Sequence, residues 1–80
     1  MTINEFKSLE WHFDSHLALA DEHALTCHAE YNGHRFGMCK HAPSMEYRVK
    51  HPHARSYTHY MIDGVVYKTN KKLIEAIKEL

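Results

Sequence analysis

The dipeptide Asn32-Gly33 limits how the middle of this 80-residue chain can pair with itself. Both residues tolerate the positive φ that a two-residue type I′ turn requires, so they predict a β-hairpin. With Tyr31 opposite His34, one face of the hairpin receives mainly apolar side chains: Leu25, Cys27, Ala29, Tyr31, Phe36 and Met38. The opposite face receives Thr26, His28, Glu30, Arg35, Gly37 and Cys39. This division supports the register and places Glu30 opposite Arg35 as a cross-strand ion pair.

The last third of the chain predicts a second hairpin followed by a helix. Asp63-Gly64 is another two-residue turn, and it sets two cross-strand pairs, Ile62 with Val65 and Tyr60 with Tyr67. Further on, Thr69 or Asn70 can accept a hydrogen bond as the N-cap of a helix. The helix has one apolar stripe, formed by Leu73, Ile74, Ile77 and Leu80.

Two other segments have patterns that are harder to interpret. Thr2 and Glu5 fit a capping box, and apolar residues at helical spacing favour a helix over residues 3–20. Alternating apolar residues over 9–19 leave a strand as the alternative. Residues 45–51 have strand-like alternation and predict a strand that Pro52 ends.

Together these segments predict an α+β fold with residues 1–80 in one domain. We expect an antiparallel sheet of about four strands, built from the Asn32-Gly33 and Asp63-Gly64 hairpins, packed on a C-terminal helix and an N-terminal helix. A chain this short buries only about 60% of its unfolded surface, so its stability is marginal. Pairing of two copies through Trp11 or a sheet edge would add burial, which favours a homodimer.

Composition and charge exclude several classes of protein. The apolar runs are too short to span a membrane and no secretion signal is evident, so we expect no membrane insertion and a cytoplasmic location. Two cysteines are too few for a disulfide scaffold. The net charge is zero, yet acidic residues predominate in 1–30 and basic residues in 31–60. This polarity favours attraction between two parts of the chain, or separate faces for two partners.

Nine histidines raise the question of a metal site. In the predicted hairpin Cys27 and Cys39 lie on opposite faces, so one ion could not easily bind both. The alternative is a zinc site formed by His28, Cys39 and His41, which share a face but lack a fourth ligand. Without zinc we expect no cofactor. No activated nucleophile, phosphate loop or carboxylate pair is evident, and we therefore expect that the protein is not an enzyme.

The segment YRVKHPHARSYTHY, residues 47–60, is basic and aromatic and contains no acidic residue. Tyrosine and arginine often anchor protein interfaces, and we expect a protein partner to contact Trp11, Arg48, Lys50, Arg55, Tyr57 and Tyr60. Alternatively, basic groups can neutralise phosphates while aromatic rings stack on unpaired bases. A site for single-stranded nucleic acid would then consist of Tyr47, Arg48, Lys50, Arg55 and Tyr57.

The order of helix, strands and helix, closing in KTNKKLIEAIKEL, resembles small α-β-β-β-α RNA-binding domains. The glycine-and-lysine helix start of the double-stranded RNA-binding family is missing, because no glycine precedes Asn70-Lys71-Lys72. In size and lack of catalytic motifs the chain is also similar to the small accessory proteins that phages use against host machinery. We therefore expect a regulator or inhibitor that docks on a protein partner, such as part of a nucleic-acid-handling machine.

Overall fold

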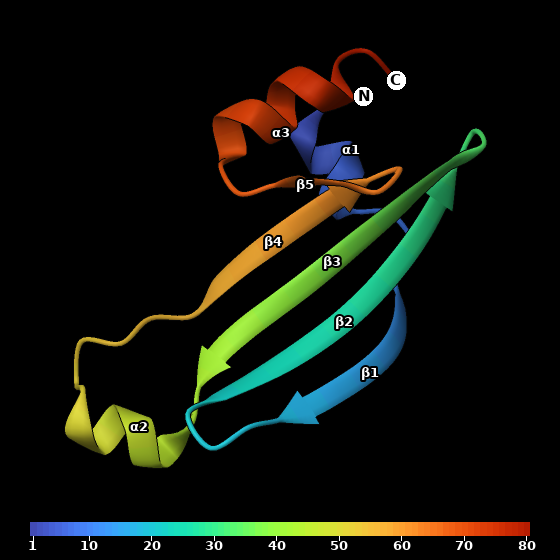
Figure 1. The fold of residues 1–80 in the computed structure, drawn as a ribbon. Coiled ribbons are helices and arrows are strands. Elements are labelled where there is room, and N and C mark those ends of the chain that lie inside the picture. Colours follow the sequence, from blue (N-terminus) through green and yellow to red (C-terminus); the bar gives the residue numbers. More distant parts are fainter.

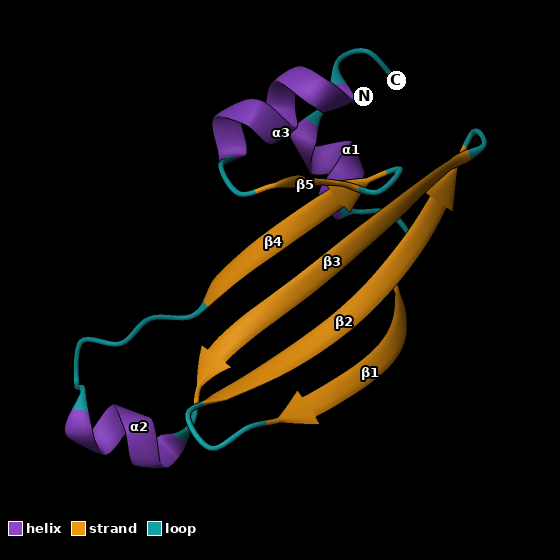
Figure 2. Cartoon of the chain, viewed as in Figure 1, coloured by secondary structure: helices purple, strands orange, loops and turns teal.

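Five antiparallel strands form one sheet in which each strand pairs with its neighbour in the chain (Figure 1, Figure 2). The computed structural model describes residues 1–80. Its elements are α1 (Ile3–Lys7), β1 (His12–Ala18), β2 (Glu22–Tyr31), β3 (His34–Pro43), α2 (Met45–Lys50), β4 (Tyr57–Ile62), β5 (Val65–Tyr67) and α3 (Asn70–Ile77). The predicted α+β class is confirmed, with five strands rather than about four. Helices α1 and α3 lie together at one end of the sheet, and α2 projects from the other end (Figure 1).

Both predicted hairpin turns are present. Asn32 and Gly33 have φ of 47° and 79°, and Asp63 and Gly64 have φ of 47° and 88°, as a type I′ turn requires. The predicted cross-strand pairs are confirmed: Tyr31 with His34, Tyr60 with Tyr67, and Ile62 with Val65. Turn chemistry therefore determined the register of four of the five strands.

The predicted helix over residues 3–20 is wrong beyond Lys7. Helix α1 begins with the expected capping box, in which the Thr2 hydroxyl accepts from the Glu5 N–H and the Glu5 carboxylate accepts from the Thr2 N–H. The helix ends at Lys7 with Ser8 as its C-cap. The chain then enters β1, whose backbone groups pair with the long strand β2.

A β-bulge interrupts the regular alternation of side chains along β1. The pairing of β1 with β2 shifts between Phe13 and Ser15, so Asp14 is the extra residue. As a result Phe13 and His16 share one face of the sheet, although they are three residues apart. Phe13 and Leu17, which a helix would bring onto one side, therefore lie on opposite faces of the sheet.

The predicted strand over residues 45–51 is also wrong, because Met45–Lys50 form helix α2. Pro43 ends β3, and the Ser44 hydroxyl accepts from the Tyr47 N–H as the helix N-cap. Ser44 is buried, and its hydroxyl and N–H donate to the carbonyls of Ala20 and Asp21 in the turn between β1 and β2. This helix lies between β3 and β4, so the order of elements differs from α-β-β-β-α.

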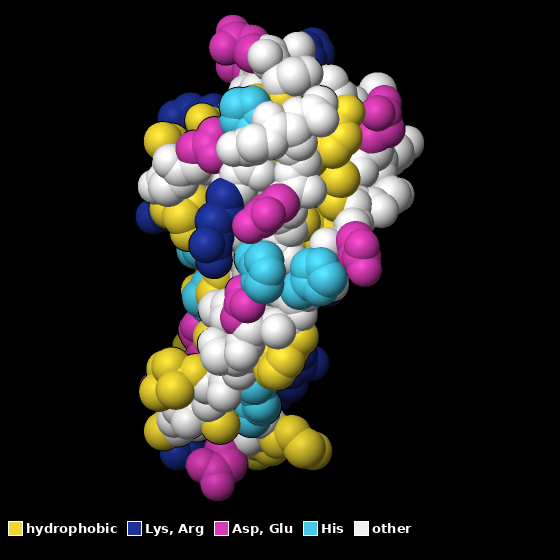
Figure 3. Space-filling model, turned by 90° about the vertical axis from the view of Figure 1, so that its right-hand side faces the viewer, with side chains coloured by type: hydrophobic (Ala, Val, Ile, Leu, Met, Phe, Trp, Pro, Cys, Tyr) yellow, Lys and Arg dark blue, Asp and Glu magenta, His cyan; other side chains and the backbone are white.

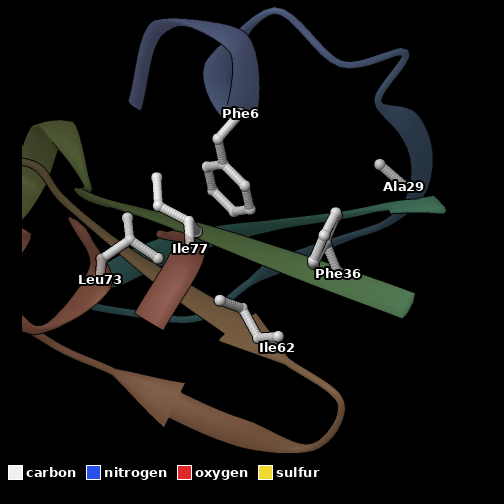
Figure 4. Packing of buried hydrophobic residues seen from close by; sticks show 6 residues of the cluster. All are labelled: Phe6, Ala29, Phe36, Ile62, Leu73 and Ile77. Atoms are coloured by element: carbon white, nitrogen blue, oxygen red, sulfur yellow. The ribbon is translucent and has the colours of Figure 1, made fainter. Parts of the chain in front are cut away.

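Helix α3 begins as predicted, with the Thr69 hydroxyl accepting from the Lys72 N–H. Within the predicted apolar stripe Leu73 and Ile77 are fully buried, and Ile74 and Leu80 are half-buried. The buried pair packs on the end of the sheet near α1 (Figure 4). The expected role of this helix as a cover for one sheet face is therefore confirmed.

The buried core is small and lies between α1, α3 and one end of the sheet. Seven of the 80 residues are buried, and the apolar ones are Phe6, Ala29, Phe36, Ile62, Leu73 and Ile77. The ring of Phe6 points from α1 toward the sheet (Figure 4). It makes edge-to-face contacts with three aromatic rings at centroid distances of 5.1 to 5.5 Å: Phe36, Tyr60 and Trp11. Phe6 therefore fastens α1 to the sheet.

Replacing Phe6 by alanine should unfold the protein or come close to doing so. A buried phenylalanine truncated to alanine costs about 3–5 kcal/mol, which is comparable to the whole stability of a small domain. The matched control is Phe13→Ala, because Phe13 is 62% exposed and its loss should cost at most about 1 kcal/mol. Urea denaturation followed by circular dichroism measures both. Equal losses for the two variants would contradict this core.

Candidate functional site

The sheet has one face that α1 and α3 do not cover, and we call it the open face. Ala29, Phe36 and Ile62 lie in register on the covered face, under the helices. Alternation along the strands therefore turns the neighbours of these residues to the open face. On the three central strands these are Thr26, His28, Glu30, Arg35, Gly37, Cys39, His41, Tyr57, His59 and Met61.

A trough of about 490 Å³ runs across the open face. Gly37 lies at its centre, between His28 on β2 and Met61 on β4. A Cβ at position 37 would lie 3.3 Å from two carbon atoms of Met61, so glycine allows this side chain to lie against the strand. The volume is within the range of about 300–1,000 Å³ that binding sites commonly have. The trough therefore offers an apolar floor to a ligand or to side chains of a partner.

Histidine–carboxylate pairs stand beside the trough. The Nδ1–H of His28 donates to the Asp14 carboxylate at 2.6 Å, and the imidazole of His12 stacks on that of His28. Further along the same face His41 donates to the Glu22 carboxylate. Figure 3 looks from the β1 side and shows histidine and acidic side chains next to one another midway along the molecule. The acidic first third of the chain is therefore hydrogen-bonded to histidines of its middle third.

A cluster of flat rings occupies the end of the open face nearer α2. His41 stacks on Tyr57 with ring centroids 4.4 Å apart and planes 10° from parallel. His59 meets the edge of His41 at 5.0 Å. The Glu22 carboxylate holds the orientation of His41, so the cluster has a defined shape. Such rings present a rigid contact surface that loses little conformational entropy on binding.

The three residues predicted as zinc ligands, His28, Cys39 and His41, do lie on one face, as the register requires. His28 and His41 are each bonded to a carboxylate, and no group of three or more histidine, cysteine or acidic side chains is placed to hold a metal ion. Burial, with the nearby Glu22 and Cys27, raises the pKa of the Cys39 thiol. A thiol with a raised pKa stays protonated near neutral pH and is a weak nucleophile.

The residues predicted to bind a partner do not form one surface. Trp11 and Tyr60 pack against the core next to Phe6, and burial raises the pKa of the Tyr60 hydroxyl. Arg48 and Lys50 belong to α2, and Arg55 lies in the connection from α2 to β4. Of the six predicted residues, Tyr57 alone lies on the open face.

The residues predicted to bind single-stranded nucleic acid are also divided between elements. Tyr47 lies on α2 and stacks on His51 at 4.2 Å, while Arg48 donates to the Pro43 carbonyl at 3.4 Å. Tyr57 begins β4 on the open face. The carboxylates on and beside this face are those of Asp14, Glu22, Glu30 and Asp63, against one guanidinium, that of Arg35. Phosphate groups would meet an acidic surface there.

The predicted ion pair between Glu30 and Arg35 does not form, although the two residues lie opposite one another. The two hairpin turns are instead linked through Asp63. Its carboxylate accepts from His34 Nδ1 at 2.7 Å and from the Arg35 N–H at 2.9 Å. These two hydrogen bonds lower the pKa of the Asp63 carboxyl below its ordinary value. They join the β2–β3 turn to the β4–β5 turn at one rim of the trough.

Sequence reasoning missed Asp14, Met61 and Asp63 as parts of this site. The sequence shows Asp63 as a turn residue, and this position suggested a role in backbone geometry alone. Asp14 reaches His28 because of the bulge in β1, and no local pattern indicates that bulge. The one available clue to the trough was Gly37, since a glycine inside a strand often marks a close approach by another group.

The chain matches no protein-family model, no curated protein and no solved structure. None of its helices is long and apolar enough to cross a membrane. The class defined by fold and site is therefore a small α+β protein with a half-covered antiparallel sheet.

Replacing Asp63 by asparagine should reduce stability at neutral pH and have little effect in strong acid. Because folding lowers the pKa of Asp63 from about 3.8, its carboxylate stabilises the fold above that value. This contribution is lost as the pH falls through the lower folded-state pKa. Melting temperatures of the wild type and Asp63→Asn should therefore converge below roughly pH 3.

The control for this prediction is Asp21→Asn, because the Asp21 side chain is exposed and makes no hydrogen bond. It should melt like the wild type across the same pH range. A constant difference between Asp63→Asn and the wild type at every pH would show that the charge of Asp63 is not responsible.

Proposed function

We propose that this protein is a small non-enzymatic binding protein whose open face docks on a basic, partly apolar surface of a protein partner. The observation that carries the proposal is the uncovered trough with its apolar floor and its histidine and carboxylate rim. An exposed apolar surface rimmed by polar groups is typical of an interaction site. The absence of an activated nucleophile, with Cys39 protonated, also favours binding over catalysis.

The charge of the open face supports a partner with lysine or arginine around an apolar centre. On and beside this face there are four carboxylates and one guanidinium. Complementary charge speeds association and selects the orientation of the two surfaces. Basic surfaces of this kind are common on proteins that handle nucleic acid, because they neutralise phosphates. The protein would then act as an inhibitor or regulator by occupying such a surface in place of the nucleic acid.

A cytoplasmic location is part of this proposal. Cys27 and Cys39 are both free, and their side chains lie on opposite faces of the sheet. Free thiols persist in a reducing compartment and tend to form disulfides outside it. A partner that handles nucleic acid would be met in the same compartment.

A photo-crosslinking amino acid at position 61 should capture the partner, and the same amino acid at position 65 should not. Met61 lies in the trough, whereas Val65 is on the covered side of the same hairpin, so the two positions are matched. The captured protein is then purified, and its affinity for Met61→Lys and Val65→Lys is measured by calorimetry. We expect Met61→Lys to weaken binding at least about tenfold and Val65→Lys to leave it unchanged.

Equal capture from both positions, or equal affinities of the two variants, would overturn docking through the open face. The nucleic-acid alternative is tested with fluorescently labelled single-stranded DNA. Tight binding that weakens steeply from about 50 to 200 mM salt and is lost in Tyr57→Ala would favour that alternative. We expect no such binding, because the open face is acidic.

A further inference from the structure

The molecule exposes more surface than a compact protein of its mass. Its accessible surface is 5963 Å², whereas a folded monomer of this mass exposes about 5,000 Å². Its radius of gyration is 14.2 Å and its extents are 43 × 25 × 20 Å, against a radius of about 12 Å for a compact chain of this length. The chain therefore leaves roughly 1,000 Å² without the cover that compact proteins provide.

Much of this exposed surface is apolar and lies at the α2 end, away from the core. Helix α2 buries none of its residues. Met45 and Val49 are 84% and 81% exposed, the highest values among the large hydrophobic residues. They are four residues apart and so share one face of the helix. Leu19, 54% exposed, belongs to the turn after β1, and the Ser44 hydrogen bonds join that turn to the start of α2.

We propose that a second copy of this chain covers the α2 end, with the two α2 helices packed antiparallel through Met45 and Val49. A chain with only seven buried residues needs further burial at all times to be stable. A second copy of the same chain can supply this burial, because it is always present. The excess exposed surface of roughly 1,000 Å² is also enough for the roughly 800 Å² that each partner buries in a stable interface. Figure 3 shows hydrophobic side chains exposed at this lower end.

The charges of α2 are complementary to those of an antiparallel copy. Glu46 and Lys50 are exposed and lie on one flank of the apolar face, near its two ends. A two-fold axis between antiparallel helices places Glu46 of each copy next to Lys50 of the other. Arg48 lies on the opposite flank and donates to the Pro43 carbonyl of its own chain. The net charge of zero adds no repulsion between copies.

This interface is separate from the trough, so the proposed partner and the second copy do not compete for one surface. The trough lies between β1 and β5 on the open face and includes no residue of α2. A dimer joined at the α2 ends would present two troughs. A partner with two equivalent basic sites would then bind with increased avidity.

Sedimentation velocity from about 1 to 100 µM tests the dimer, and the melting temperature should rise over the same range of concentration. Met45→Lys combined with Val49→Lys should raise the dimer dissociation constant at least about 100-fold. Val65→Lys is the matched control, because Val65 is an exposed valine at the other end of the molecule. It should leave the dissociation constant within about threefold of the wild type.

Exchange of the two charges tests the arrangement of the helices. Glu46→Lys and Lys50→Glu alone should each raise the dissociation constant roughly two- to tenfold, and their combination should restore it. A wild type that is monomeric at about 100 µM, with a melting temperature independent of concentration, would overturn the proposal. So would a dimer that the lysine variants leave intact. If the double lysine variant unfolds, two measurements still test the proposal. They are the concentration dependence of the wild-type melting temperature and the dissociation constants of the charge-exchange variants.

Discussion

The placement of a single ring, that of Phe6, determines which face of the sheet is covered. The five-residue helix α1 is too short to be stable by itself, and its capping box adds only about 1 kcal/mol. Contacts of Phe6 with Phe36, Tyr60 and Trp11 hold it on the sheet. Helix α3 packs beside α1 on the same core. The other face stays uncovered because both terminal helices pack on this one.

Residues that act through local geometry made much of the fold predictable from the sequence. The turns at Asn32-Gly33 and Asp63-Gly64 require positive φ, and the pairing of four strands follows from them. Thr69 and the apolar stripe of α3 are equally local signals. One local signal was misinterpreted. Ser44 after Pro43 is a helix N-cap, but the aromatic and branched residues of 45–51 suggested a strand.

The candidate site was less predictable because its parts meet through tertiary structure. His28, Cys39 and His41 were correctly placed on one face, since strand alternation alone determines that. The carboxylate partners of His28 and His41 come from β1 and the start of β2, and the bulge in β1 has no sequence signature. The basic and aromatic segment 47–60 looked continuous in sequence. In the structure a helix and a connection divide it, and Tyr60 enters the core.

The meander order of the strands has a consequence for how the chain folds. Each strand pairs with the next one in sequence, and every pair except β3 with β4 closes a short loop, because residues 44–56 with α2 separate those two strands. The core forms differently, because it joins residues that are far apart in the sequence. Phe6 comes from α1, and Leu73 and Ile77 come from α3. A ribosome would therefore release all five strands before the helix that stabilises them. During that interval the core lacks Leu73 and Ile77, and the apolar residues that they cover are exposed to aggregation.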